Sequence, residues 1–118
     1  MGDPVIHFEI RAADAERARQ FYAQLFRWTI DTDPDGYGVV STGAGTGIDG
    51  GILASREGAP PSITFYVGVD DLEKCLSRAE ELGGSRVVGP TSVGEAGSFA
   101  LFADPDGNTV GLFTGTGG

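Results

Sequence analysis

The chain has 118 residues, of which 40% are hydrophobic and 21% charged, as expected for a single soluble globular domain. Its formal net charge of −9, from 17 acidic and 8 basic residues, excludes a basic surface, so we expect neither nucleic acid nor an anionic membrane as a partner. The sequence contains no membrane-length apolar run and no signal peptide, and its single cysteine cannot form an internal disulfide; we therefore expect a cytoplasmic protein.

The first predicted elements are a strand over residues 5–10 and a helix from Asp14 to Trp28. Strand alternation divides the first segment into an apolar face and a mixed face, the latter carrying Val5, His7 and Glu9. Asp14 is a good N-cap for the helix. The predicted buried stripe of this helix consists of Ala18, Phe21, Tyr22 and Leu25.

Short strands are predicted next, near residues 28–32, 37–42 and 48–54. A turn over residues 33–36, with the sequence Asp-Pro-Asp-Gly, separates the first two of these strands. The glycine-rich run over residues 43–47 is not followed by a helix. We therefore expect it to form a mobile loop over a cavity mouth and not a phosphate-binding loop.

The second half begins with a strand over residues 63–68, followed by a helix from Leu72 to Leu82. Ile63, Phe65 and Val67 form the apolar face of this strand, which we expect to lie against the helices. Its predicted N-cap is Asp70, with Glu73 completing a capping box, and glycines 83–84 end it. Its predicted buried stripe is Leu72, Cys75, Leu76, Ala79 and Leu82, which makes Cys75 a packing residue. Strands follow near residues 86–88 or on to 93, 98–103 and 109–114. The turn 104–107 joins the last two strands, and the tail 115–118 is expected to fray.

These halves repeat one pattern. Residues 6, 8 and 10 align with residues 63, 65 and 67 at a constant offset of 57, which also aligns Asp14 with Asp71. One such unit cannot bury its apolar face alone, so we expect two βαβββ modules, 4–57 and 61–115, within a single domain over 1–118. The predicted fold class is α+β. A groove between the modules would hold a ligand.

This layout, with Phe21-Tyr22…Leu25-Phe26, Val69-Asp70-Asp71-Leu72 and Phe102-Ala103-Asp104-Pro105-Asp106-Gly107-Asn108, resembles the vicinal oxygen chelate superfamily of glyoxalases, bleomycin-resistance proteins and extradiol dioxygenases. The resemblance covers residues 5–114. It implies a cup-shaped, barrel-like mixed sheet with the helices outside, and a homodimer.

The resemblance also implies a metal ligand on the first and the last strand of each module. These positions fall at His7, Thr64, Gly111 and, near the end of module one, Gly51. Only His7 can ligate, whereas a catalytic divalent metal needs about three protein ligands. We therefore expect no cofactor, with His7, Glu9 and Asp49 as weak candidates for a metal recruited in another way.

The mixed strand faces supply the candidate binding residues. His7 and Glu9 form the one plausible acid–base pair, and both are also candidate catalytic residues. Tyrosine offers a ring for stacking and a hydroxyl for hydrogen bonding. The predicted ligand-binding set is His7, Glu9, Tyr37, Thr64, Tyr66 and Phe99. The faces of Tyr37 and Phe99, like those of Trp28 and Phe102, stay open because a shift of one residue exchanges them.

Three functions are compatible with these residues. The favoured one is a metal-independent binding protein that sequesters or carries a small hydrophobic, partly aromatic or cationic molecule, with the missing metal ligands and the acidic balance in its favour. The second is a lyase, isomerase or dioxygenase-type enzyme that uses His7 and Glu9 with or without a divalent metal. The third is a partner module with no ligand of its own. Fold alone does not decide between them.

Overall fold

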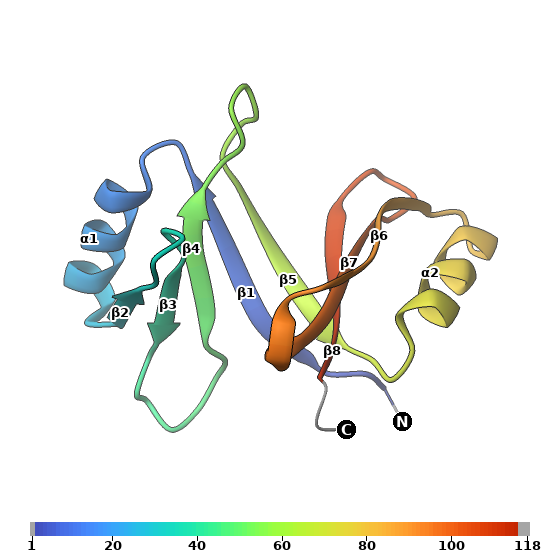
Figure 1. The fold of residues 1–118 in the computed structure, drawn as a ribbon, viewed down its shortest axis with the longest axis horizontal. Helices are drawn as coiled ribbons and strands as arrows, with labels where there is room; N and C mark the ends of the chain where they lie inside the picture. Colours follow the sequence, from blue (N-terminus) through green and yellow to red (C-terminus); the bar gives the residue numbers. More distant parts are fainter. Residues whose placement is uncertain (1, 116–118) are drawn as a thin grey trace. The chain divides into compact units, whose positions relative to one another are not determined.

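The computed structural model describes residues 2–115 and divides into two compact units (Figure 1). The first unit is His7–Thr64, and the second combines the chain up to Ile6 with the chain from Phe65 onward. The predicted end of the tail, residues 116–118, lies outside the described residues.

The elements follow the order βαβββ twice, which confirms the α+β class and the doubled module. The first set comprises β1 (Val5–Ala12), α1 (Ala15–Phe26), β2 (Thr29–Thr32), β3 (Gly38–Ser41) and β4 (Gly50–Ala54). The second comprises β5 (Ser62–Gly68), α2 (Leu72–Glu81), β6 (Ser85–Ser92), a short 3-10 helix η1 (Gly94–Ala96), β7 (Gly97–Ala103) and β8 (Thr109–Gly115). No helix in the part of the chain that the structure describes could span a membrane.

In the first unit the strands lie in the order β2-β3-β4-β1, with β1 and β4 parallel and the other pairs antiparallel. Its core is Ile10, Val40 and Ile52, and the partly buried side chains against it are Phe8, Ala18, Tyr22, Trp28 and Ile30. Of the predicted apolar face of β1, Phe8 and Ile10 therefore pack with residues of α1, whereas Ile6 is 40% exposed. His7, Glu9 and Arg11 alternate with these residues and lie on the opposite face of the sheet.

Of the four residues in the predicted buried stripe of α1, two are packed against the core and two are exposed. Ala18 and Tyr22 pack on the core, but Phe21 is 58% exposed and Leu25 is 57% exposed. A helix of twelve residues over a small four-stranded sheet covers it with one narrow face, so the neighbouring stripe positions remain on the surface.

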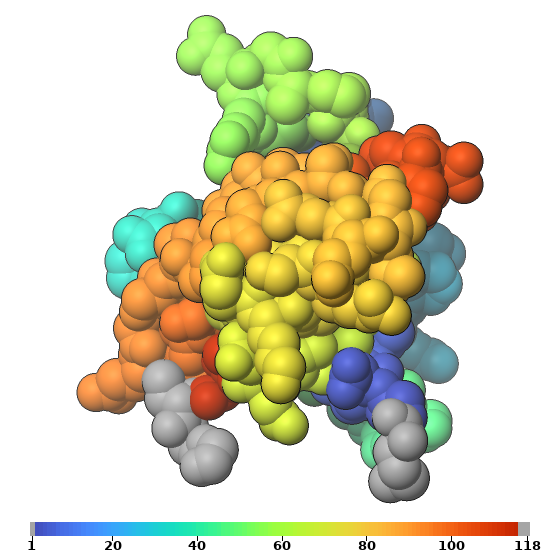
Figure 2. Space-filling view, turned by 90° about the vertical axis from the view of Figure 1, so that its right-hand side faces the viewer, coloured from blue at the N-terminus to red at the C-terminus, as the bar shows by residue number. Residues whose placement is uncertain are grey.

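In the second unit the strands lie in the order β5-β8-β7-β6, with β5 and β8 parallel. Leu72 and Leu76 of α2 pack on Ala100 and Leu112 of the sheet. The partly buried side chains around this core are Val67, Val69, Cys75 and Phe102, so Cys75 packs as predicted. Figure 2 shows α2, in yellow to gold, and the start of β6, in orange, on the surface that faces the viewer.

Three further apolar residues that the sequence pattern assigns to the core are exposed: Ile63 by 69%, Phe65 by 44% and Leu82 by 63%. For β5 the reason is pairing, because β5 contacts β8 only over Tyr66–Gly68. Leu82 lies one residue beyond the end of α2, where it no longer faces the sheet.

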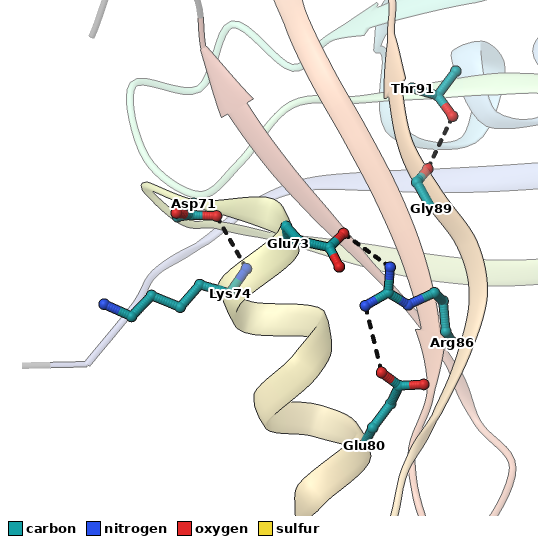
Figure 3. A network of polar contacts seen from close by, with 7 residues as sticks. All are labelled: Asp71, Glu73, Lys74, Glu80, Arg86, Gly89 and Thr91. Carbon is teal, nitrogen blue, oxygen red and sulfur yellow. Dashed lines mark hydrogen bonds and ion pairs between the residues drawn. The ribbon is translucent and has the colours of Figure 1, made fainter.

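Both helices begin with the same cap. The carboxylate of Asp14 accepts a hydrogen bond from the backbone N–H of Arg17 at 3.0 Å. The carboxylate of Asp71 accepts one from the backbone N–H of Lys74, also at 3.0 Å (Figure 3). The predicted cap at Asp70 is thus wrong by one residue, although the repeat had already aligned Asp14 with Asp71. Glu73 forms no capping box either, because its carboxylate pairs with Arg86 of β6 at 2.8 Å.

Candidate functional site

The candidate site in the first unit is the sheet face opposite α1. β1 places His7, Glu9 and Arg11 on this face by strand alternation. The register of the parallel pair β1–β4 sets Gly51 directly opposite Glu9, and Tyr37 precedes β3, the next strand. Residues that are far apart in the sequence therefore meet on one face.

His7 is half-buried and hydrogen-bonded to a tyrosine. Its Nε2 atom lies 3.0 Å from the hydroxyl of Tyr37, which joins two of the predicted binding residues. Burial lowers the pKa of His7 below its ordinary value of 6.5, and the negative charges of Glu9 and Asp49 oppose that effect without overcoming it. The imidazole is therefore neutral at pH 7, so one of its nitrogens donates a hydrogen bond and the other accepts one.

Glu9 is buried, at 8% exposure, and pairs with Arg11. The guanidinium donates to one carboxylate oxygen from Nε at 3.3 Å and from a terminal nitrogen at 3.2 Å. A buried carboxylate needs such a partner, because an isolated charge is costly to desolvate. Arg11 is not among the predicted site residues, although its position two residues after Glu9 places it on the same strand face.

Tyr37 lies over a glycine. A Cβ atom added at Gly51 would overlap the far end of the Tyr37 ring and its hydroxyl. Gly51 is buried, so the ring takes the space in which a side chain at position 51 would project. The open question of the Tyr37 face is answered: it lies on the candidate-site side.

The second unit repeats this arrangement with other residues. Tyr66 lies opposite Gly111 in the β5–β8 pair, and a Cβ atom at Gly111 would overlap the Tyr66 ring. Tyr66 is 6% exposed. Phe99 pairs with Phe113, two residues after Gly111, and therefore shares the face of Tyr66, whereas Phe102 and Trp28 pack in the cores.

Thr64 belongs to the first unit and is half-buried. Asp49 is exposed at the start of β4, and its carboxylate accepts a hydrogen bond from the backbone N–H of Thr42 at 3.0 Å. This bond closes the base of the glycine-rich loop 43–47. The side chain thus has a structural role that the sequence did not reveal.

These residues do not fit a divalent metal. Of the four positions at which the resemblance implies ligands, two are glycines covered by phenol rings, one is a threonine, and His7 alone carries a ligating group. Arg11 already donates hydrogen bonds to one oxygen of the Glu9 carboxylate. Within residues 2–115, no three His, Cys, Asp or Glu side chains gather closely enough to hold a metal ion.

A groove of about 550 Å³ lies elsewhere in the first unit, between α1, the end of β1 and the start of β5. Apolar side chains dominate its lining, which includes Ala12, Ala18, Phe21, Tyr22, Pro61 and Ile63. The sequence did not predict this groove, because Phe21 and Ile63 were assigned to the core.

The fold and the doubled module define the class of protein. The chain belongs to the Glyoxalase/Bleomycin resistance protein/Dioxygenase superfamily, whose family model matches residues 5–112.

Sequence relatives agree with this assignment. The chain is 32% identical to a glyoxylase-like domain-containing protein of Didymella fabae, with 90% of this chain and 89% of that protein covered. It is 30% identical to CFP32 of Mycobacterium bovis over 89% of this chain, and 27% identical to the anthracycline biosynthesis protein DnrV of Streptomyces peucetius over 85%. The chain spans only 43% of CFP32 and 42% of DnrV.

Solved structures share the fold at low identity. A superfamily member from Vibrio splendidus aligns with a TM-score of 0.67 at 17% identity, over 96% of this chain and 99% of that chain. Methylmalonyl-CoA epimerase from Mycobacterium tuberculosis aligns with a TM-score of 0.69 at 15% identity, over 95% of this chain and 87% of that chain. At these identities the likeness establishes the fold and not the activity.

Proposed function

We propose that this protein binds a small, partly aromatic, cationic molecule without a metal, and that it sequesters or carries that molecule. The observation that supports the proposal best is the hydrogen bond of 3.0 Å between His7 and Tyr37, at a position where the family would place a metal ligand. The pair offers neutral polar groups and an aromatic ring for binding, in place of a Lewis acid.

The preference for a cation rests on charge. Glu9 and Asp49 lie near enough to His7 to act on its pKa, and the whole chain carries a net charge of −9. A protonated amine would be attracted by these carboxylates and could lie against a tyrosine ring through a cation–π contact. The contacts predicted in the first unit are His7, Glu9, Tyr37 and Thr64, and those predicted in the second unit are Tyr66 and Phe99.

Two relatives are consistent with this ligand class. DnrV and DauV, at 27% and 26% identity, are named for anthracycline biosynthesis. Anthracyclines are planar aromatic molecules that carry an amino sugar, which combines the two chemical features that the site favours.

A second candidate function is catalysis within the same superfamily. His7 favours it, because a half-buried imidazole that is neutral at pH 7 can accept a proton. Glu9 is the less favoured candidate of the two, since its carboxylate already accepts two hydrogen bonds from Arg11. Conversion of a bound compound, lost in His7→Ala, would favour a lyase or isomerase over a binding protein.

The test of binding is a fluorescence titration with doxorubicin, an anthracycline with a protonated amine. We expect saturable binding that weakens about tenfold in Glu9→Gln, since a hydrogen bond to a charged group contributes about 1.5–3 kcal/mol. Asp106→Asn, in the exposed turn before β8, is the matched control, because it removes one negative charge and should leave binding unchanged. Equal weakening of binding in both variants would mean that the net charge of the protein, and not a contact with Glu9, causes the effect. The absence of saturable binding would contradict the proposal and would favour the third function, a partner module with no ligand of its own.

We also propose that the protein is a cytoplasmic homodimer. The surface of α1 supports a dimer, because Phe21, Leu25 and Phe26 are each more than half exposed, and contiguous apolar surface of this kind is typical of interfaces. Sedimentation equilibrium of the wild type should give a molecular mass twice that of the chain. The Leu25→Glu variant should give the mass of a single chain. A monomeric wild type would contradict this proposal.

A further inference from the structure

Gly51 has a role that neither the family match nor the proposed function assigns. It lies directly opposite Glu9 in the parallel pair β1–β4, and the equivalent pair β5–β8 sets Gly111 opposite Tyr66. Glu9 and Tyr66 are separated by the repeat offset of 57. The two glycines therefore occupy the same place in their modules, on the last strand beside the first.

A phenol ring covers each of these glycines, but it comes from a different place in each module. Tyr37 reaches Gly51 from the turn before β3, whereas Tyr66 reaches Gly111 from the neighbouring strand β5. Both glycines are buried, and any Cβ atom at either position would overlap the ring. The two modules thus reach the same arrangement with tyrosines from unrelated positions. This indicates that an aromatic ring packed on a bare backbone is required at both glycines.

Geometry then links Gly51 to His7. The part of Tyr37 that a side chain at position 51 would displace is the hydroxyl and the adjoining ring carbons. The same hydroxyl makes the hydrogen bond of 3.0 Å to His7 Nε2. Any larger residue at position 51 must therefore move the atom that contacts the imidazole.

We propose that Gly51 is a positioning residue: its bare backbone admits the Tyr37 phenol to the place of a metal-ligating side chain and holds the hydroxyl on His7. The module thereby replaces a metal site with a hydrogen-bonded histidine–tyrosine pair. Gly111 admits Tyr66 in the same way in the second module. The two glycines are part of this arrangement and are not simply positions at which a metal ligand is missing.

The test uses the fact that His7 is the only histidine in the chain, so its ring protons can be followed by proton NMR in protein without a histidine tag. In Gly51→Ala we expect the His7 resonances to move away from their wild-type positions and its pKa to rise toward the ordinary value. Tyr37→Ala should produce a similar change, and the double variant Gly51→Ala/Tyr37→Ala should add little to Tyr37→Ala alone. Both substitutions open the imidazole to water by moving the same ring.

Gly89→Ala is the matched control, because a Cβ atom at Gly89 meets no atom within 4 Å and its backbone is not left-handed. It should leave the His7 resonances at their wild-type positions. Wild-type resonances in Gly51→Ala, together with shifted ones in Tyr37→Ala, would overturn the proposal. So would full additivity of the two substitutions in the double variant.

A second measurement on the same wild-type sample tests the replacement of the metal site. After treatment with a chelator and its removal, one equivalent of Zn²⁺ should leave the His7 resonances in place. A stoichiometric change in these resonances that Tyr37→Phe abolishes would make His7 and Tyr37 metal ligands and would overturn the proposal. This measurement involves no small-molecule probe, so its outcome is independent of the ligand class proposed above.

Discussion

The ring of Tyr66 lies directly over Gly111, its neighbour across the parallel strands β5 and β8. The ring is 6% exposed, and the atoms nearest to the missing Cβ belong to the base and one edge of the ring. Such a ring cannot swing away as the far end of a side chain can. The two glycine–tyrosine pairs therefore differ in how readily they can accommodate a methyl group.

We predict that Gly111→Ala destabilises the protein by about 1–3 kcal/mol, the usual cost of adding a methyl group to a tightly packed place. Gly51→Ala should cost less, because only the outer end of Tyr37 must move. Urea unfolding measures both, with Gly89→Ala as the control for the change from glycine. Equal stability of Gly111→Ala and wild type would show that the Tyr66 ring does not pack as described.

The helix caps give a second prediction. Asp71→Ala should lower the free energy of unfolding by about 1 kcal/mol, because the Lys74 N–H loses its hydrogen-bond acceptor at the start of α2. Asp70→Ala removes the same charge one residue earlier and should cost little. If the two variants unfold at the same urea concentration, the cap is misplaced.

The comparison of Asp70 with Asp71 illustrates what the sequence could predict. Periodicity and the 57-residue offset located both helices, all eight strands and the first cap. The second cap failed because two adjacent aspartates offer the same chemistry, and only the backbone conformation distinguishes them. The repeat, which aligns Asp14 with Asp71, predicts the correct N-cap at Asp71.

The site was predictable only in part. Strand alternation placed His7 and Glu9 on one face, and the structure agrees. The contact of Tyr37 with His7 joins residues 30 positions apart through the pairing of β3, β4 and β1, and no local pattern encodes that register. For the same reason Gly51 looked like an empty ligand position, because the ring that covers it comes from the turn before β3.

A third prediction concerns pH. The pKa of His7 is lower in the folded protein than its ordinary value of 6.5, because burial disfavours the charged ring. Above that ordinary value both states are neutral at this residue and folding is not penalised. As the pH falls below it, the unfolded chain takes up the proton first, so stability is lost progressively down to the folded pKa.

Unfolding of wild type and His7→Gln between neutral pH and pH near 5 measures this effect. The wild type should lose more stability than the variant over this range, and the carboxylates common to both cancel in the comparison. Parallel curves for the two proteins would mean that His7 titrates normally in the folded state.

A fourth prediction concerns the ion pairs of Arg86. Its guanidinium contacts Glu73 at 2.8 Å and Glu80 at 3.4 Å, and the hydrogen bond from Arg86 lowers the pKa of Glu73 (Figure 3). These groups face solvent, so Arg86→Gln should lower the midpoint of thermal unfolding slightly at low salt and not at high salt. Arg78→Gln, which breaks a more exposed pair with Glu81, should have a smaller effect. A loss that persists at high salt would point to packing of the Arg86 side chain instead.

We propose that this member of the superfamily binds its ligand without a metal. The most direct measurement is a doxorubicin titration of chelator-treated protein, repeated after addition of Mn²⁺, Ni²⁺ or Zn²⁺. We predict the same dissociation constant with and without each ion, and weaker binding in His7→Ala under all conditions. Binding that appears only with a metal ion and is lost in His7→Ala would contradict it.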